Sequence, residues 1–157
     1  MIRQMEKCDW ERVSEIYKQG IESGKATFTA TCPSFEEWDR NHLKECRLVY
    51  EEDGMVYGWA AVSPTSYREV YKGVVEVSIY IDEKKTGKGI GTQLMQAVIE
   101  GARACGFWSI FSVILSVNRG SIEFHKKCGF REIGYKERIA KDRFGVWQNT
   151  TLMELRL

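Results

Sequence analysis

The glycine-rich segment Gly87-Lys88-Gly89-Ile90-Gly91-Thr92 is the part of the chain whose residue types point most directly to chemistry. It follows a strand-like run and precedes a segment with the apolar spacing of a helix. Backbone without side chains lets several amide groups converge on an anion, and a helix N-terminus adds a partial positive charge. The segment therefore predicts a cradle for phosphate, with a turn that merely caps a helix as the alternative.

Two common phosphate-binding designs do not match this segment. A Walker A loop needs Gly-x4-Gly-Lys followed by Ser or Thr, but Gly89 follows Lys88, and Asp82 stands where the first glycine would be. A Rossmann fingerprint needs a third glycine at the position of Thr92 or Leu94. The pattern must therefore belong to another class of phosphate site or to a simple turn.

Glu76 is the second candidate for chemistry, because of its place in residues 74–81. In that run Val75, Val77, Ile79 and Ile81 point one way, and Val74, Glu76, Ser78 and Tyr80 point the other. A carboxylate on the polar face of an aliphatic strand can be partly desolvated, which raises its pKa toward the range of a general base. The alternative is an ordinary glutamate that faces solvent.

His125 is a third candidate, in a short predicted helix over residues 121–127 that ends before Gly129. Histidine exchanges a proton near neutral pH, so His125 can act as an acid or as a second base. A packing histidine beside Phe124 is the alternative. We expect no metal, since the chain has no cluster of His and Cys ligands, and no Ser-His-Asp motif is present.

The elements that position these residues alternate between helices and strands. Helical spacing and capping residues predict four helices, at residues 10–20 or 10–24, after the capping box Ser34 to Glu37, at 91–104, and at 121–127. Alternating apolar residues predict strands at 47–51, 56–62, 74–81, 108–115, 132–139 and 146–155. Asp53-Gly54 suits a tight hairpin turn between the first two. The order predicts a mixed α/β fold.

Composition narrows the class of partner. The chain has 157 residues and a formal net charge of +1, without a block of Lys or Arg. A nucleic acid or a membrane surface would favour a strongly basic patch, so we expect neither, and a small-molecule substrate is favoured. The length suits a single domain over residues 1–157.

The cysteines and the N-terminal residues bear on location. The five cysteines are scattered and form no Cys-x-x-Cys pair, which is typical of reduced thiols in a cytosolic protein. The first residues are charged and lack the apolar core of a signal peptide. No stretch approaches the roughly 20 apolar residues that span a bilayer. We therefore expect a cytoplasmic protein.

Two motifs together resemble the GNAT superfamily of N-acetyltransferases. The glycine loop is similar to its acetyl-CoA loop, Gln/Arg-x-x-Gly-x-Gly/Ala, with Gly89-Ile90-Gly91 as the core and Thr86 at the Gln/Arg position. Residues 118–130 are similar to the pattern Asn-x-x-Ala-x-x-Leu-Tyr-x-x-x-Gly-Phe. Within the superfamily the chain resembles the phosphinothricin acetyltransferase and amino-acid N-acetyltransferase group over nearly its whole length, although the family tail Trp-x-Asp reads Trp147-Gln148-Asn149.

The resemblance implies a fold and a way of holding acetyl-CoA. The expected fold is a mixed, mostly antiparallel, twisted central sheet of six to seven strands, flanked by about four helices and splayed between the fourth and fifth strands. Pantetheine would add there like an extra strand, on the backbone of Ile79, Tyr80 and Ile81. Gly87, Lys88, Gly89, Ile90, Gly91 and Thr92 would hold the pyrophosphate, and Asn118 would bond the pantetheine or the region near the sulfur.

The resemblance also implies roles in the reaction. An acetyl thioester is already activated, so direct transfer to an amine needs neither a metal nor a covalent nucleophile. Glu76 would be the general base, and His125 stands where many relatives carry a tyrosine that protonates the leaving thiolate. Phe28 would form an apolar wall, while Arg68 and Tyr71 would recognise the substrate, because a guanidinium suits a carboxylate or phosphinate.

The expected function is therefore acetyl-CoA-dependent N-acetylation of the primary amine of a small amino acid or analogue. Phosphinothricin, methionine sulfoximine and methionine sulfone are the substrate types that the resemblance implies. It also implies a homodimer with the C-terminal strands near the shared interface. The alternatives are acetylation of a protein N-terminus, a polyamine or an aminoglycoside, or a CoA-binding sensor without catalysis.

Overall fold

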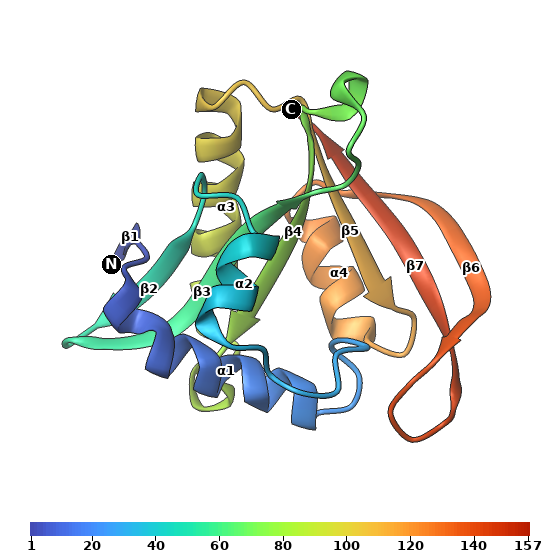
Figure 1. Ribbon diagram of the computed structural model, residues 1–157, viewed down its shortest axis with the longest axis horizontal. Helices are drawn as coiled ribbons and strands as arrows, with labels where there is room; N and C mark the ends of the chain where they lie inside the picture. The colour runs from blue at the N-terminus through green and yellow to red at the C-terminus, as the bar shows by residue number, and fades with distance from the viewer.

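The computed structural model describes residues 1–157 as a seven-stranded open sheet with helices on both faces (Figure 1). The strand order is β1-β2-β3-β4-β5-β7-β6, and only the β4–β5 pair is parallel. The elements are β1 (Ile2–Gln4), α1 (Trp10–Glu22), α2 (Phe35–Asn41), β2 (Leu48–Glu52), β3 (Met55–Pro64), β4 (Val74–Ile81), α3 (Ile90–Ala104), β5 (Ser109–Leu115), α4 (Arg119–Lys127), β6 (Arg131–Lys141) and β7 (Trp147–Arg156). This mixed, mostly antiparallel sheet with four α-helices confirms the expected fold class.

Three short 3₁₀ turns and the strand β1 are the elements that the sequence does not predict. The turns are η1 (Lys7–Asp9), η2 (Glu69–Tyr71) and η3 (Glu83–Lys85). Each of these elements has three residues, which is too short for a hydrophobic period to be recognised. The predicted helices and strands are confirmed, with bounds that shift by up to two residues.

Helix α1 ends between the two glycines, Gly20 and Gly24, at which its sequence predicts a C-terminus. It continues through Gly20 and ends at Glu22, and Gly24 then takes a left-handed φ of 72°. A Cβ at position 20 would approach the Tyr80 ring to 2.5 Å. The glycine therefore lets α1 lie close against β4. In α2, Ser34 accepts the backbone N–H of Glu37, which is half of the predicted capping box.

Two apolar clusters fill the two faces of the sheet. The larger joins α3 and α4 to one face, through residues such as Val75, Leu94 and Ile122. The smaller joins α1 and α2 to the other face, around Trp38 and Trp59. In β3, Trp59 and Ala61 belong to the smaller cluster and Ala60 and Val62 to the larger, as strand alternation requires. Trp59 is 1% exposed and belongs to the core.

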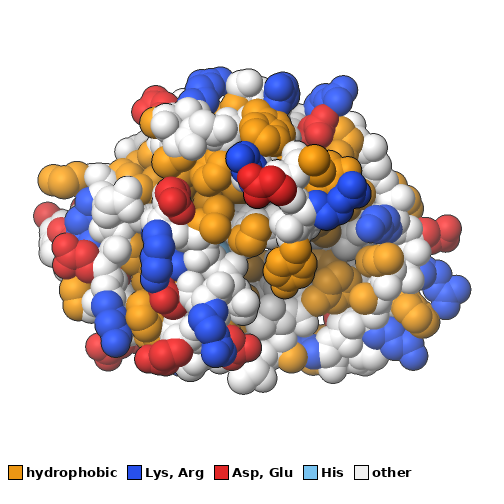
Figure 2. All heavy atoms as spheres, turned by 45° about the horizontal axis from the view of Figure 1, so that its top comes forward, with side chains coloured by type: hydrophobic (Ala, Val, Ile, Leu, Met, Phe, Trp, Pro, Cys, Tyr) orange, Lys and Arg blue, Asp and Glu red, His pale blue; other side chains and the backbone are white.

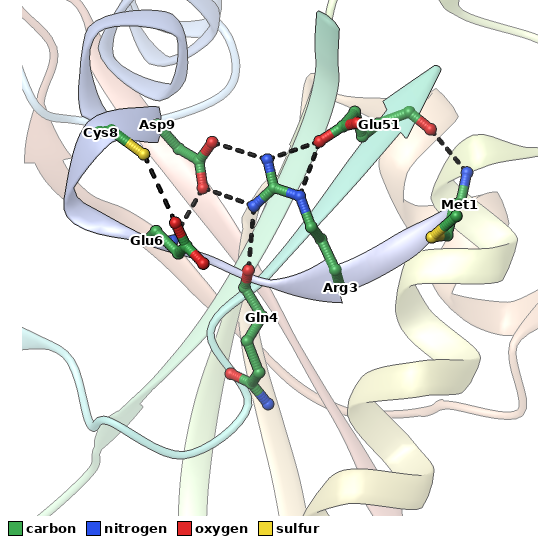
Figure 3. Close-up of polar contacts among 7 residues, drawn as sticks. All are labelled: Met1, Arg3, Gln4, Glu6, Cys8, Asp9 and Glu51. Atoms are coloured by element: carbon green, nitrogen blue, oxygen red, sulfur yellow. Dashed lines mark hydrogen bonds and ion pairs between the residues drawn. The ribbon is translucent and has the colours of Figure 1, made fainter. Parts of the chain in front are cut away.

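A polar cluster fastens the start of the chain to the sheet (Figure 3). The Arg3 guanidinium donates two bonds of 2.8 Å to the Asp9 carboxylate and one of 2.7 Å to Glu51. The N-terminal amine of Met1 donates to the Glu51 carbonyl at 2.6 Å. Hydrogen bonds from Arg3 lower the pKa of Asp9, although burial opposes the shift. The cluster joins β1, β2 and the start of α1.

The sheet opens between β4 and β5, and this opening positions the site. Their pairing includes only Val74 with Ser109, Val75 with Ile110, and Glu76 with Phe111. Beyond that point β5 stays paired with β7 along its whole length, while β4 stays paired with β3 through Ile81. The two strands therefore diverge toward the C-terminal end of each, as Figure 1 shows.

The surface carries mixed charge. Figure 2 shows acidic and basic side chains interspersed around apolar ones on the face that includes the top of Figure 1, without a single basic area there. No helix combines the length and apolar character needed to cross a membrane. The hairpin of β6 and β7 extends from the body of the molecule, and β6 is exposed along nearly its whole length.

Candidate active site

A cavity of about 1200 Å³ occupies the opening between β4 and β5. Most of its lining comes from four parts of the chain: residues 76–81 of β4 with the glycine loop after it, the middle of β5, the helix α4, and the end of α1 with the loop that follows it. These parts are far apart in sequence, and the divergence of the two strands brings them around one space.

The glycine loop forms one end of this cavity. Gly87 and Gly89 have φ angles of 75° and 77°, and Gly89 is the N-cap of α3. These left-handed conformations favour glycine, and a Cβ at either position would meet nothing within 4 Å. Open space over a glycine backbone at a helix N-terminus suits a phosphate group. All residues from Gly87 to Thr92 except Lys88 line the cavity.

The buried carboxylate of Asp82 anchors the start of the glycine loop to helix α1. Asp82 is 2% exposed, forms an ion pair with Arg12 of α1, and accepts the backbone N–H of Lys84 at 2.8 Å. Gln19 of α1 accepts the backbone N–H of Glu83 at 3.0 Å. Helix α1 therefore positions the chain between β4 and α3. The sequence has no signal for this contact, because the ion-paired residues are 70 positions apart.

The free edge of β4 forms the floor of the cavity. Pairing with β5 ends at Glu76, so residues 77–81 have a strand partner only on the β3 side. Their remaining backbone groups face the cavity, where an extended ligand can bond to them as an added strand does. Ile79, Tyr80 and Ile81 all line the cavity.

Glu76 lies where the two strands separate, paired with Ser63 on β3 and Phe111 on β5. It points to the α1/α2 face, since its neighbours Val75 and Val77 belong to the opposite cluster. No cation or hydrogen-bond donor pairs with its carboxylate, and burial raises its pKa. A desolvated carboxylate of this kind can take a proton near neutral pH.

His125 also lines the cavity, but it is deeply buried, with 2% exposure. Its Nδ1 lies 2.7 Å from the Ser121 carbonyl oxygen, and its Nε2 lies 3.1 Å from the Ser112 hydroxyl. The rings of Phe124 and Phe130 pack edge-on against it. Burial lowers its pKa, and the bond to the Ser121 carbonyl opposes this shift. Sequence reasoning did not find Ser112.

Asn118 and Phe28 also line the cavity. Asn118 is the N-cap of α4, and its side-chain oxygen accepts the backbone N–H of Ser121 at 3.3 Å. That bond leaves the side-chain amide nitrogen available to the cavity. Phe28 lines the opposite wall in the loop between α1 and α2, together with Lys25 and Thr27.

The structure does not bring Arg68 and Tyr71 to this cavity. Both lie in the loop between β3 and β4, and Tyr71 is 46% exposed. The Arg68 guanidinium lies 5.5 Å from the centre of the Tyr71 ring, so the two side chains contact each other. Neither is among the residues that line the cavity. The physical reason is that this loop leaves the sheet where β4 begins, at the end where β4 and β5 are paired.

Residues 6–130 match the acetyltransferase (GNAT) family, and the chain belongs to that family. It is 30% identical over 161 residues to L-methionine sulfoximine/L-methionine sulfone acetyltransferase from Salmonella typhimurium, covering 99% of this chain and 94% of the relative. It is 38% identical over 104 residues to the Pseudomonas aeruginosa protein of the same name, covering 66% of this chain but only 60% of that relative's length. The family resemblance of the two sequence motifs is thereby confirmed.

Solved structures agree with this assignment. A phosphinothricin acetyltransferase of the GNAT superfamily from Sinorhizobium meliloti, in complex with acetyl-CoA, has a TM-score of 0.88 and 29% identity. That match covers 100% of this chain and 88% of the other. The overall fold is therefore that of the acetyltransferase family.

Proposed function

We propose that this chain is an acetyl-CoA-dependent N-acetyltransferase for the primary amine of a small amino acid or analogue. The acceptors that we propose are of the methionine sulfoximine, methionine sulfone or phosphinothricin type. One observation carries the proposal: a single cavity joins a glycine cradle at a helix N-terminus, a free strand edge and an unpaired, half-buried carboxylate. The names of the related proteins support the choice of acceptor.

The residues present fit acetyl-CoA. The open space over Gly87 and Gly89 suits the pyrophosphate, and the free edge at Ile79, Tyr80 and Ile81 suits the amide groups of pantetheine. The Asn118 amide nitrogen is available beside it. When bound, acetyl-CoA supplies an activated acetyl thioester. The chain's own task is to orient the acceptor and to manage its protons.

Glu76 is the proposed general base, acting directly or through a water molecule. An amino acid enters as its ammonium form, which has no lone pair to attack a carbonyl. Glu76 removes one proton from it, and its raised pKa makes the carboxylate a better base than an exposed glutamate. His125 is the second proposed proton-transfer group. Phe28 provides the wall against which the acceptor packs, while contacts from Arg68 and Tyr71 stay predictions.

We also propose that the chain works as one N-acetyltransferase domain in a homodimer. The edge strand β6 exposes Ile133, Tyr135 and Ile139 at 43%, 55% and 48%, and Trp147 of β7 is 47% exposed. An exposed edge strand with apolar side chains favours pairing with another chain. The cytoplasmic location expected from the cysteines stays a prediction.

A panel of amines tests the proposal. Purified protein is incubated with acetyl-CoA and each amine, and free thiol and the N-acetyl product are measured. The panel contains methionine sulfoximine, methionine sulfone, phosphinothricin, ordinary amino acids, a polyamine, an aminoglycoside and a peptide with a free N-terminus. We expect release of CoA with the amino-acid analogues. Turnover only with a polyamine, an aminoglycoside or a peptide refutes the proposed class of acceptor. Binding of acetyl-CoA without turnover of any amine refutes the proposal that the chain is an enzyme.

A further inference from the structure

The hydrogen bonds of His125 have a fixed direction. A carbonyl oxygen can only accept, so Nδ1 must carry the hydrogen that bonds to Ser121 at 2.7 Å. In a neutral imidazole the other nitrogen then has no hydrogen and must accept. Nε2 therefore accepts the Ser112 hydroxyl hydrogen at 3.1 Å.

This direction determines what Ser112 offers to the cavity. Its only hydrogen is directed to His125, so its oxygen presents lone pairs and can accept a hydrogen bond from a ligand. The chain of bonds runs from the cavity through Ser112 and His125 to the Ser121 carbonyl. Its open end requires a donor, such as an N–H or an S–H group.

Ser112 lies at the point where the sheet opens. It follows Phe111, the last residue of β5 that pairs with β4, and it lines the cavity. Its neighbours Ile110 and Ile114 belong to the cluster on the α3/α4 face, whereas Glu76 points to the α1/α2 face. Glu76 and Ser112 therefore flank the opening between the strands from opposite faces of the sheet.

We infer that Ser112 contacts the reacting amine and passes its proton to His125, which acts through this hydroxyl rather than by direct contact with substrate. The inference rests on the function proposed above. It adds a residue that neither sequence motif contains, and it orders the two roles open to His125, which begins as a base and then returns the proton as an acid.

The proton balance is complete without any further reactant. Glu76 takes the first proton from the ammonium group and releases it to water after the products leave. As the C–N bond forms, the amine gives a second proton to the Ser112 oxygen, and the Ser112 hydroxyl proton passes to Nε2 of His125. As the C–S bond breaks, the same path returns that proton to the sulfur. One hydroxyl can serve both atoms because nitrogen and sulfur are bonded to the same carbon at that stage.

The surroundings of His125 agree with a base that begins neutral. Phe124 and Phe130 enclose its ring, and burial lowers its pKa. On α4, Glu123, Lys126 and Lys127 are exposed, and no charged side chain contributes to the pKa of His125.

Kinetics of Ser112 variants test the inference. We expect Ser112→Ala to lower kcat about 100-fold, the scale of general acid–base catalysis, with KM for acetyl-CoA within about twofold. Ser112→Thr keeps a hydroxyl and should restore most of the rate. Ser116→Ala is the matched control, since it removes a similar bond, 2.9 Å to Thr151, outside this cavity. It should leave kcat unchanged.

A double variant tests whether the two residues act as a unit. Ser112→Ala combined with His125→Gln should be no slower than the slower single variant, because each change interrupts the same path. Multiplying effects would show independent roles and overturn the inference. An acetyl group found on Ser112 by peptide mass spectrometry would also overturn it, since it would show a covalent path.

A spectroscopic measurement is independent of turnover. The chain has two histidines, so ¹⁵N NMR of the imidazoles is readily assigned. We expect the hydrogen of His125 on Nδ1, and a shift of the Nε2 signal in Ser112→Ala but not in Ser116→Ala. A hydrogen on Nε2 in the parent protein would overturn the inference. A parent protein that acetylates no amino-acid analogue refutes the proposed function instead, and the kinetic comparison then uses the amine that the panel identifies.

Discussion

Gly89→Ala separates a phosphate cradle from a turn that only caps a helix. Gly89 has a φ of 77°, and a Cβ there would meet no atom of the protein. Without acetyl-CoA, the substitution therefore reduces the free energy of unfolding only through backbone strain, by about 1 to 2 kcal/mol for a left-handed residue. That cost lowers the melting temperature by about 2 to 8 °C in a chain of this size.

The effect on acetyl-CoA binding should be larger than this conformational cost explains. The added methyl group occupies the space where an anion would approach the loop amides. Loss of one hydrogen bond to a charged group costs about 1.5 to 3 kcal/mol. We expect the dissociation constant for acetyl-CoA, measured by calorimetry, to rise about 10- to 100-fold.

Gly54→Ala is the matched control. Gly54 has a φ of 75°, also has nothing within 4 Å of its Cβ position, and lies in the β2–β3 turn away from the cavity. Its melting temperature should fall by a similar amount, while its affinity for acetyl-CoA stays that of the parent. If Gly89→Ala loses stability but binds acetyl-CoA as tightly as Gly54→Ala does, the loop is only a helix cap and the reasoning is refuted.

Three other outcomes are expected. Glu76→Gln should lower kcat by about 10² or more. It should also raise the melting temperature at pH 7, because burial raises the pKa of Glu76 in the folded state, so the folded protein loses stability as pH rises through that pKa and the carboxyl ionises. Thermal scans at pH 4 and 7 should show that the difference in melting temperature between variant and parent shrinks on acidification. Asp82→Asn should weaken the anchor to Arg12, costing about 1 to 3 kcal/mol in denaturant unfolding and reducing affinity for acetyl-CoA; unchanged affinity would contradict the anchoring role. Ile139→Lys should convert the dimer to a monomer in light scattering, whereas Met55→Lys, an equally exposed position on another hairpin, should not; a parent protein that is already monomeric contradicts the dimer.

Local features were predictable from the sequence because their causes are local. Asp53 and Gly54 adopt φ angles of 52° and 75°, as the hairpin turn between β2 and β3 requires. The alternation of residues 74–81 assigned Glu76 to the face opposite Val75 and Val77. The glycine loop before α3 was predicted from steric and electrostatic properties of a few adjacent residues.

Contacts between distant elements could not be predicted in this way. The anchor of the glycine loop depends on Arg12 and Asp82, which meet only because α1 crosses the α1/α2 face of the sheet. Arg68 and Tyr71 have residue types suited to an acidic substrate, yet their loop directs them to each other.

The sequence by itself determined the types of element, the face on which Glu76 lies and the glycine cradle, because each follows from a local period or from backbone sterics. Only the tertiary structure decided that the cavity exists and what meets in it. β5 pairs with β7 along its length and with β4 at only three positions, so the hydrogen bonding of the sheet opens the site. The same packing sets the Ser112 hydroxyl against Nε2 of His125, whereas the Ser121 carbonyl, four residues earlier in α4, determines that Nδ1 holds the proton.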